Sequence, residues 1–348
     1  MPLYPLLLEP TLHTRVWGGR RLETVMTKKL PTSDPYGESW ELHDTSKVAN
    51  GEYAGRTLGD LLTEFGDRLI GTDNDPAKGI PLLVKIIDAN DWLSIQVHPD
   101  DAQAAALEGQ PRGKTEAWVV LAADKKDDKP PRLVRGIKSG TTREALTKAI
   151  SENSVESLLE YAEVEVGDVL YMPAGSIHAL GPGLLIYEIQ QSSDTTYRLY
   201  DWGRVGLDGK PRELHIDKGV QVSNLDTLPQ VEHQQDSKSL MELVRGKYFT
   251  TLMFNLTDQK PLQYFMHKEA PRRYFHALTC VDGAFSVEGM LIAASGPVTD
   301  SRKFLGPRTP PLTVEKGQTV MIPAIFDMYR LTARTPNAQA LCSYQSNR

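Results

Sequence analysis

The sequence has little cysteine, no excess of positive charge and no long apolar run. Only two of its 348 residues are cysteines, Cys280 and Cys342, which is too few for a disulfide framework and typical of a reducing compartment. Its 39 lysine and arginine residues are outnumbered by 45 aspartate and glutamate residues, so the charge balance predicts neither a nucleic acid nor an anionic membrane as a partner. No apolar run approaches the ~18–20 residues that a membrane-spanning helix needs.

The amino-terminal segment also lacks the features of a secretion signal. No basic region precedes its apolar residues, no small-residue cleavage site follows them, and Pro2, Pro5 and Pro10 would interrupt a signal helix. Together with the low cysteine content, this predicts a cytoplasmic location. With 40% apolar and 24% charged residues, the chain has a globular composition and is long enough for about two domains of ~100–200 residues.

Short runs rich in β-branched and aromatic residues, bounded by Gly, Pro, Asp or Asn, dominate the chain. This pattern is typical of the strands of sandwiches and barrels. The clearest runs are residues 81–87, 92–98, 117–122 and 184–189. The sequence therefore predicts a mainly β protein with a few inserted helices.

Helical periodicity is confined to three segments, residues 99–107, 142–161 and 236–244. Asp100 or Asp101 is expected to cap the first of these helices and not to act in catalysis. The polar stretch 221–238 is the best candidate for a linker between domains, and His233 within it is expected to be exposed to solvent.

An internal echo supports two copies of one β-domain. The run Val164-Glu-Val-Gly-Asp-Val-Leu-Tyr-Met-Pro173 recurs as Val314-Glu-Lys-Gly-Gln-Thr-Val-Met-Ile-Pro323, with a turn glycine six residues before a proline. The copies then diverge, because Met328 stands where the first copy has His178. We expect an N-terminal catalytic domain over residues 1–235 and a C-terminal domain without metal-ligating residues over residues 236–348.

Several polar residues of the first copy could converge on one point. Residues i and i+2 of a strand share a face, so Gln96 and His98 could act together, as could Lys114 and Glu116. Two imidazoles, a carboxylate and an amide oxygen would suit a divalent cation such as Zn²⁺. Each signal is weak alone, because a strand Gln-x-His or a single histidine after a turn is usually structural.

The motifs taken together resemble a known family. Gly167-x5-Pro-x-Gly-x-x-His178 is similar to the second metal motif of the cupin superfamily, and residues 93–100 with 113–118 are similar to the first. More narrowly, the chain resembles type I mannose-6-phosphate isomerase in its short bacterial form. The motifs that carry this likeness are Trp17-Gly-Gly19, Gly37-Glu-Ser-Trp40, Ser94-Ile-Gln-Val-His-Pro-Asp-Asp101, Gly113-Lys-Thr-Glu-Ala-Trp118, Pro173-Ala-Gly-Ser-Ile-His-Ala-Leu180 and Ser193-Asp-Thr-Thr-Tyr-Arg-Leu-Tyr-Asp-Trp-Gly-Arg204.

The resemblance implies two cupin-like jelly-roll barrels and one bound Zn²⁺, although another divalent metal would also suit the ligands. The family's metal ligands fall on Gln96, His98, Glu116 and His178. Positions tied to catalysis fall on Lys114, Glu188, Asp194 and Arg198, and positions near the bound sugar phosphate fall on Lys85 and Ser94. One departure is Gly113, where longer family members carry a histidine before the Lys-x-Glu.

The implied reaction interconverts mannose 6-phosphate and fructose 6-phosphate by moving a proton between C1 and C2 through an enediol. Residue chemistry leaves Lys114, Glu188 and Asp194 open as the proton carrier, whereas the permanently charged Arg198 suits phosphate or enediolate oxygens. The alternatives are an isomerase of another or unphosphorylated sugar, a sugar-phosphate-binding cupin without turnover, and a dioxygenase cupin, which Gln96 in place of a histidine disfavours. The sequence does not indicate an oligomeric state.

Overall fold

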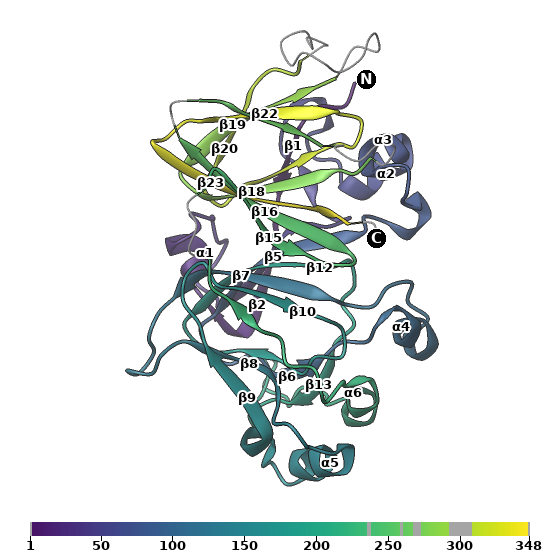
Figure 1. Cartoon of the computed structure of the whole chain (residues 1–348), viewed down its shortest axis with the longest axis vertical. Coiled ribbons are helices and arrows are strands. Elements are labelled where there is room, and N and C mark those ends of the chain that lie inside the picture. Colours follow the sequence, from purple (N-terminus) through teal and green to yellow (C-terminus); the bar gives the residue numbers. More distant parts are fainter. Residues whose placement is uncertain (1, 235–237, 258–259, 267–272, 292–307, 347–348) are drawn as a thin grey trace. The chain divides into compact units, whose positions relative to one another are not determined.

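The computed structural model describes residues 2–234, 238–257, 260–266, 273–291 and 308–346. Strands dominate these residues and helices are few and short (Figure 1). The chain forms two compact units. One unit comprises Leu12–Ser39 and Leu83–Gln235, and the other comprises Met1–Thr11, Trp40–Leu82 and Asp236–Arg348.

A seven-stranded sheet and two smaller sheets form the unit around residues 83–235. The large sheet has the order β14 (Val231–Glu232), β10 (Val169–Met172), β7 (Glu116–Ala123), β12 (Leu184–Gln191), β5 (Leu82–Ala89), β3 (Tyr36–Leu42) and β2 (Thr11–Gly19). The smaller sheets are β11 (Ala179–Leu180), β8 (Arg132–Ile137) and β9 (Leu159–Glu163), and β13 (Tyr197–Tyr200) with β6 (Ile95–Val97). Apolar side chains of β7, β10 and β12 pack with those of β8 and β11, so this unit is a sandwich.

The other unit is also built from two sheets. A seven-stranded sheet has the order β15 (Leu240–Arg245), β16 (Phe249–Thr257), β23 (Asn337–Gln345), β18 (His276–Asp282), β21 (Thr319–Ile322), β1 (Leu6–Glu9) and β4 (Lys47–Val48). A four-stranded sheet has the order β17 (Leu262–Phe265), β22 (Met328–Ala333), β19 (Ala284–Met290) and β20 (Leu312–Glu315). The predicted mainly β fold with two jelly-roll domains is thereby confirmed, as open sandwiches whose sheets do not close into barrels.

The compact units are not continuous in sequence. Strand β1 pairs with β21, with Leu6 opposite Met321, so the amino-terminal residues complete the sheet of the unit that contains residues 236–348. The division into an N-terminal catalytic domain over residues 1–235 and a C-terminal cupin-like domain over residues 236–348 remains a prediction.

The internal echo corresponds to two equivalent turns. Gly167 and Gly317 have φ of 93° and 81°, in the left-handed region where a side chain is strained. Each glycine N–H donates to a neighbouring strand, Gly167 to Val120 O at 2.9 Å and Gly317 to Cys280 O at 2.8 Å. Each turn leads into a short buried strand, β10 or β21. The repeated sequence therefore marks the same structural element in both units.

Helix α4 (Asp101–Glu108) begins where the sequence predicts. Asp100 is its N-cap and accepts a hydrogen bond from Gln103 N at 2.8 Å, while the Gln103 side chain returns one to Asp100 N at 3.0 Å. This supports the interpretation of Asp100 as a cap.

Two other helix predictions need correction. Helix α5 (Arg143–Ser151) stops well before residue 161, because Asn153 turns the chain with φ of 52° and β9 then pairs with β8. The helix predicted over 236–244 is wrong: residues 235–237 lie outside the described part, and from Leu240 the chain is strand β15, paired with β16. Pairing with a neighbouring strand overrides the weak local periodicity in both places.

The predicted linker is mostly part of a folded unit. Residues 216–222 form helix α6 (Ile216–Val222), Asn224 N donates to Gly175 O at 2.8 Å, and β14 pairs with β10. His233 is exposed as predicted, with Nδ1 2.6 Å from Asp168 Oδ1. Within the described residues, no helix has both the length and the apolar character needed to cross a membrane.

Candidate metal centre and active site

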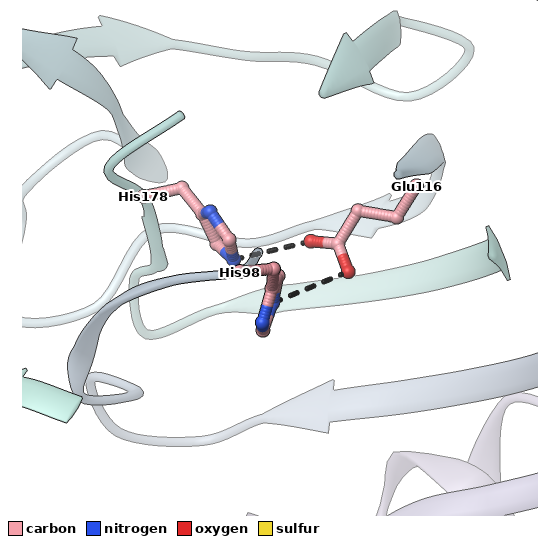
Figure 2. Close-up of side chains that lie close together, drawn as sticks. All are labelled: His98, Glu116 and His178. Atoms are coloured by element: carbon pink, nitrogen blue, oxygen red, sulfur yellow. Dashed lines mark ion pairs between the residues drawn. The ribbon is translucent and has the colours of Figure 1, made fainter. Parts of the chain in front are cut away.

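Three buried side chains meet in the unit around residues 83–235. His98 follows β6, Glu116 opens β7 and His178 precedes β11, and Figure 2 shows their side chains pointing toward one another. One ligand atom from each lies within 4.8 Å of the other two. Backbone bonds between Gln96 and His178, at 3.0 and 2.9 Å, bring these segments together. Of the two such groups in the described part of the chain, this is the one whose members are all buried.

Both imidazoles are oriented by backbone carbonyls. His98 Nδ1 lies 2.9 Å from Thr195 O, and His178 Nδ1 lies 2.9 Å from Ser176 O. Because a carbonyl only accepts, each Nδ1 carries the proton and each Nε2 presents its lone pair to the cluster. This is the arrangement that metal-ligating histidines adopt.

Glu116 supplies the negative charge. Its Oε1 lies 3.1 Å from His178 Nε2 and its Oε2 lies 3.6 Å from His98 Nε2. Oε1 is buried and accepts no hydrogen bond from any residue that the structure describes. Burial alone would raise the pKa of this carboxyl group, but neighbouring groups, the charge of Lys114 first among them, outweigh it and hold the pKa well below its usual value. A carboxylate and two imidazole lone pairs that converge in a buried place fit a divalent cation.

Gln96 is the fourth predicted ligand and lies at the same place. Its side-chain amide is 3.2 Å from His178 Nε2. A half-turn about the last side-chain bond would direct its oxygen to the cluster. The predicted set Gln96, His98, Glu116 and His178 is therefore brought together by the fold.

Lys114 adds a cation to the cluster. Its Nζ lies 2.6 Å from Glu116 Oε2 and 2.8 Å from His98 Nε2. Burial alone would lower the pKa of this amine, but the carboxylates of Glu116 and Glu188 outweigh it and raise the pKa above its usual value. Burial, followed by the charge of Lys114, lowers the pKa of His98 well below its usual value. His98 is thus neutral, as a metal ligand must be.

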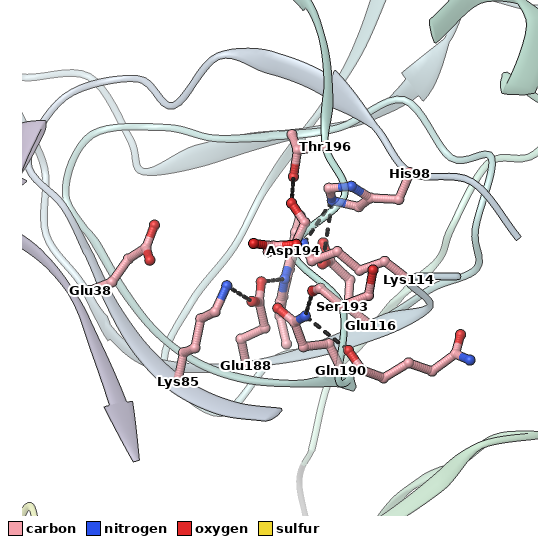
Figure 3. Close-up of polar contacts among 12 residues, drawn as sticks. Glu38, Lys85, His98, Lys114, Glu116, Glu188, Gln190, Ser193, Asp194 and Thr196 are labelled. Carbon is pink, nitrogen blue, oxygen red and sulfur yellow. Dashed lines mark hydrogen bonds and ion pairs between the residues drawn. The ribbon is translucent and has the colours of Figure 1, made fainter. Parts of the chain in front are cut away.

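A second buried ion pair lies beside the cluster on the same sheet. Glu188 is opposite Trp118 in the pairing of β12 with β7, and Trp118 Nε1 donates to Glu188 Oε2 at 3.0 Å. Lys85 of β5 lies 3.4 Å from Glu188 Oε1. Figure 3 shows Lys85 and Glu188 with Lys114 and Glu116. Two lysines and two glutamates are therefore gathered on the neighbouring strands β5, β12 and β7 and on the residues just before β7.

The segment that carries Lys114 and Glu116 is held by side chains on its other side. Asp101 Oδ1 accepts from Gly113 N at 2.8 Å and from Gln191 Nε2 at 2.8 Å, and Thr115 N donates to Gln191 Oε1 at 3.0 Å. A Cβ at Gly113 would lie 2.6 Å from Pro99 O and would also overlap Asp100 C. Gly113 is therefore required by the close approach of two backbones.

Comparison with known proteins matches the chain to one family. The family model "Phosphomannose isomerase type I, catalytic domain" matches residues 6–118. The chain is 41% identical to the mannose-6-phosphate isomerase of Streptococcus mutans over 74% of this chain and 81% of that protein. It is 36% identical to a mannose-6-phosphate isomerase of Bacillus subtilis, over 76% of this chain and 83% of that protein.

The chain belongs to the type I phosphomannose isomerase family.

The solved structures agree with this family assignment. The crystal structure of mannose 6-phosphate isomerase from Bacillus subtilis matches with a TM-score of 0.79 and 25% identity, over 98% of this chain and 99% of that one. The putative mannosephosphate isomerase of Archaeoglobus fulgidus matches in fold with a TM-score of 0.72, over 99% of each chain. The predicted membership of an isomerase family is thus confirmed.

Not every residue suggested by the family resemblance contacts the cluster. Arg198 lies opposite Gln96 in the pairing of β13 with β6, but its guanidinium donates to Glu213 O at 2.8 Å. Burial, followed by the charge of Arg212, lowers the pKa of Arg198. Asp194 is exposed in the turn whose Thr195 carbonyl accepts from His98. The catalytic roles of Arg198 and Asp194 remain predictions.

The two residues that are predicted to bind the substrate, Lys85 and Ser94, are buried. Ser94 lies just before β6 and Lys85 is engaged by Glu188. Their proposed contact with the sugar phosphate is a prediction, and Lys85 would have to share its charge with Glu188.

Sequence reasoning missed several residues that build the site. Asp101, interpreted only as part of a cap, holds Gly113 and Gln191. Gln190 lies opposite Glu116 and received no role. Strand alternation in β12 could have identified Gln190, because it lies two residues after Glu188, a predicted catalytic residue, and therefore on the same face of the strand. The contacts of Asp101 depend on loop geometry that no local pattern reveals.

Proposed function

We propose that this protein interconverts mannose 6-phosphate and fructose 6-phosphate in a metal-dependent reaction. The relatives named as mannose-6-phosphate isomerases cover most of the chain, which supports this substrate pair. The observation that carries the proposal is the buried group of His98, Glu116 and His178 with the Lys114 amine in contact with it. Binding a sugar phosphate without turnover would not require a buried amine at such a cluster.

Zn²⁺ is the metal that we propose. Imidazole nitrogen and carboxylate oxygen are donors that Zn²⁺ accepts, and His98, Glu116, His178 and Gln96 would hold it. When bound, the ion would supply positive charge that polarises a carbonyl group and stabilises negative charge on oxygen. The Nδ1–H bonds of both histidines keep the ligand nitrogens directed inward in advance of binding.

The chemistry requires one proton to move between C1 and C2 while the carbonyl shifts from C1 to C2. Removal of the C2 proton of the open-chain aldose gives an enediolate, and protonation of its O1 gives the enediol. Delivery of a proton to C1, with loss of the proton on O2, then gives the ketose. Three groups could carry that proton: the Lys114 amine, the Glu188 carboxylate and the Asp194 carboxylate. Both Lys114 and Glu188 are buried. Glu188 lies in β12, and Lys114 lies just before the neighbouring strand β7. Either group could therefore carry the proton without exchanging it with bulk water.

The remaining charges suit the ends of the substrate. We propose that Lys85 and Ser94 contact the sugar phosphate and that Arg198 stabilises its anionic oxygens. Arg204 and Arg212, both bonded to Asp201, add positive charge near Arg198. We also propose a cytoplasmic location, which the two buried free thiols Cys280 and Cys342 support.

A coupled isomerisation assay tests the proposal. Mannose 6-phosphate is supplied to the protein as purified, after removal of metal with a chelator, and after Zn²⁺ is restored, with free mannose in parallel. We expect turnover of the phosphorylated sugar that is lost on chelation and recovered with Zn²⁺, with free mannose inert. No turnover by metal-loaded protein would refute the substrate assignment, and turnover that survives complete metal removal would refute the metal dependence.

A further inference from the structure

Gln190 is a buried amide on the same face of the sheet as the metal cluster. It is fully buried, and in the pairing of β12 with β7 it lies directly opposite Glu116. Side chains of directly opposed residues in an antiparallel pair project to the same face, with Cβ atoms about 4.5–5.5 Å apart. Glu188 is two residues away on the same strand and therefore on that face too. Figure 3 shows Gln190 with these residues.

The Gln190 amide is held in one orientation. Its Nε2 donates to Gln191 O at 3.0 Å and to Ser193 O at 2.5 Å. Both partners are carbonyl oxygens, which only accept, so the NH₂ group and not the oxygen must face them. The two bonds use both of the amide hydrogens. Because Nε2 is bonded to two backbone carbonyls of the turn that leads to Asp194, this turn determines where Oε1 lies.

The Oε1 atom is a buried acceptor without a donor. It is shielded from solvent and accepts no hydrogen bond from any residue in the described part of the chain. A buried polar atom left unsatisfied destabilises a fold, so such an atom beside a reaction site points to a partner that arrives with the ligand. Because Oε1 can only accept, that partner must bring a hydrogen.

We infer that Gln190 is a substrate-binding residue, whose Oε1 accepts a hydrogen bond from a hydroxyl group on carbons 1 to 3 of the sugar phosphate. This inference rests on the proposed function. A sugar is dense in hydroxyl donors, and the end of the sugar that reacts must lie at the cluster that contains Glu116. The charged groups beside Gln190 have partners already: Lys114 bonds Glu116 and His98, and Lys85 pairs with Glu188. A neutral hydroxyl of the ligand is the donor that the site lacks.

The consequence is a means of discriminating among substrates. A buried acceptor rejects an analogue that lacks the matching hydroxyl, because that analogue leaves the acceptor unsatisfied in the complex. Gln190 thereby reads one hydroxyl near the reacting carbons, a role separate from binding the phosphate.

Inhibition by alditol phosphates tests this inference. Mannitol 6-phosphate carries the hydroxyls of the open-chain sugar and cannot be isomerised, and its 1-deoxy, 2-deoxy and 3-deoxy derivatives each lack one. Inhibition constants are measured for the metal-loaded wild type and for Gln190→Met, which keeps an unbranched side chain and removes the acceptor together with the two N–H donors. Gln110→Met, at an exposed position, is the matched control.

We expect one deoxy compound to bind the wild type about tenfold more weakly than mannitol 6-phosphate, a difference of ~1.4 kcal/mol. In Gln190→Met, mannitol 6-phosphate itself should weaken about tenfold, and that deoxy compound should lose nothing further. For the other two derivatives, the ratio of the inhibition constant to that of mannitol 6-phosphate should be the same in Gln190→Met as in the wild type. Gln190→Asn, which keeps an amide but withdraws it by one methylene, should behave as Gln190→Met does.

Other outcomes overturn the inference. Equal weakening of every compound by Gln190→Met would mean a general effect on the pocket, and unchanged constants would mean no contact. Loss of bound metal or of thermal stability in both variants would make Gln190 structural. Turnover of mannose 6-phosphate by the wild type is measured in the same preparation. Failure of that turnover refutes the proposed function, whereas the comparison of variants refutes the role of Gln190.

Discussion

The Lys114 amine lies 2.6 Å from Glu116 Oε2, an oxygen that also belongs to the candidate metal centre. Its other close contact is His98 Nε2, at 2.8 Å. An ammonium group and a divalent cation would therefore compete for Glu116 and His98. Like charges repel strongly in a buried place, so a bound metal would displace Lys114 toward Glu188, the next carboxylate that acts on it.

Replacing Lys114 should separate metal binding from turnover. In Lys114→Met, we expect kcat to fall by about 10²-fold or more, since one general acid–base group contributes about that much. The affinity for Zn²⁺ should stay the same or increase, because a competing cation is gone. Competition with a chromophoric chelator measures the affinity. Lys148→Met, at an exposed helix position, is the control for loss of a lysine. A marked loss of metal from Lys114→Met would contradict the idea that the Lys114 ammonium group competes with the metal ion.

The stability of the metal-free protein should fall in mild acid because of His98. Burial, followed by the charge of Lys114, lowers the folded-state pKa of His98 well below the value of about 6.5 expected for the unfolded chain. Below that pH the unfolded chain binds a proton that the folded protein excludes. The free energy of unfolding should therefore decrease as the pH falls from 6.5, by at most about 1.4 kcal/mol per pH unit for this group.

Denaturant unfolding in the presence of a chelator, from pH 7.5 to 5, measures this slope. His98→Gln should have a shallower slope than the wild type. Parallel curves for the wild type and His98→Gln would show that His98 is not the group responsible.

Gly113→Ala should disturb the site although no catalytic side chain changes. The added Cβ would overlap the backbone at Pro99 and Asp100, so the segment that carries Lys114 and Glu116 must shift. We expect a loss of stability of about 1–3 kcal/mol, as for overpacking elsewhere, and a fall in kcat/KM of at least about tenfold. Gly59→Ala, where the nearest atom to the new Cβ is 3.4 Å away, is the control. Normal kinetics in Gly113→Ala would mean that this close approach is not needed.

Arg198→Ala should lower kcat/KM by about 10²-fold or more, if its charge meets an anionic oxygen of the substrate. Metal content should be unchanged, because Arg198 donates to Glu213 O and not to a ligand atom of the cluster. Arg56→Ala, in the other compact unit, is the control. If Arg198→Ala had a near-normal kcat/KM and intact metal, Arg198 would have no role in the reaction.

The convergence of the candidate metal-ligating residues could be predicted from the sequence because they follow strand alternation and one turn motif. Gln96 and His98 are two residues apart, as are Lys114 and Glu116, and this spacing places both side chains of each pair on one face of a strand. The glycine turn before His178 has a strict conformational requirement, which makes it visible as a repeat at Gly317. The family resemblance then joined signals that were weak one by one.

What the sequence left hidden depends on contacts between distant segments. The strand at Leu240 is stabilised by β16, and the short helix α5 ends because β9 pairs with β8, so local periodicity misleads in both. The clamp of Asp101 on Gln191 spans residues 90 positions apart in the chain. Such contacts exist only once the sheets have formed.

The absence of room at Gly113 limits how the segment in front of the candidate metal centre can be redesigned. Even a methyl group at this position would overlap the preceding backbone. A bulkier side chain therefore requires residues 99–100 to take another path. A redesign of this segment has to change that path and the residue at position 113 together, as one block.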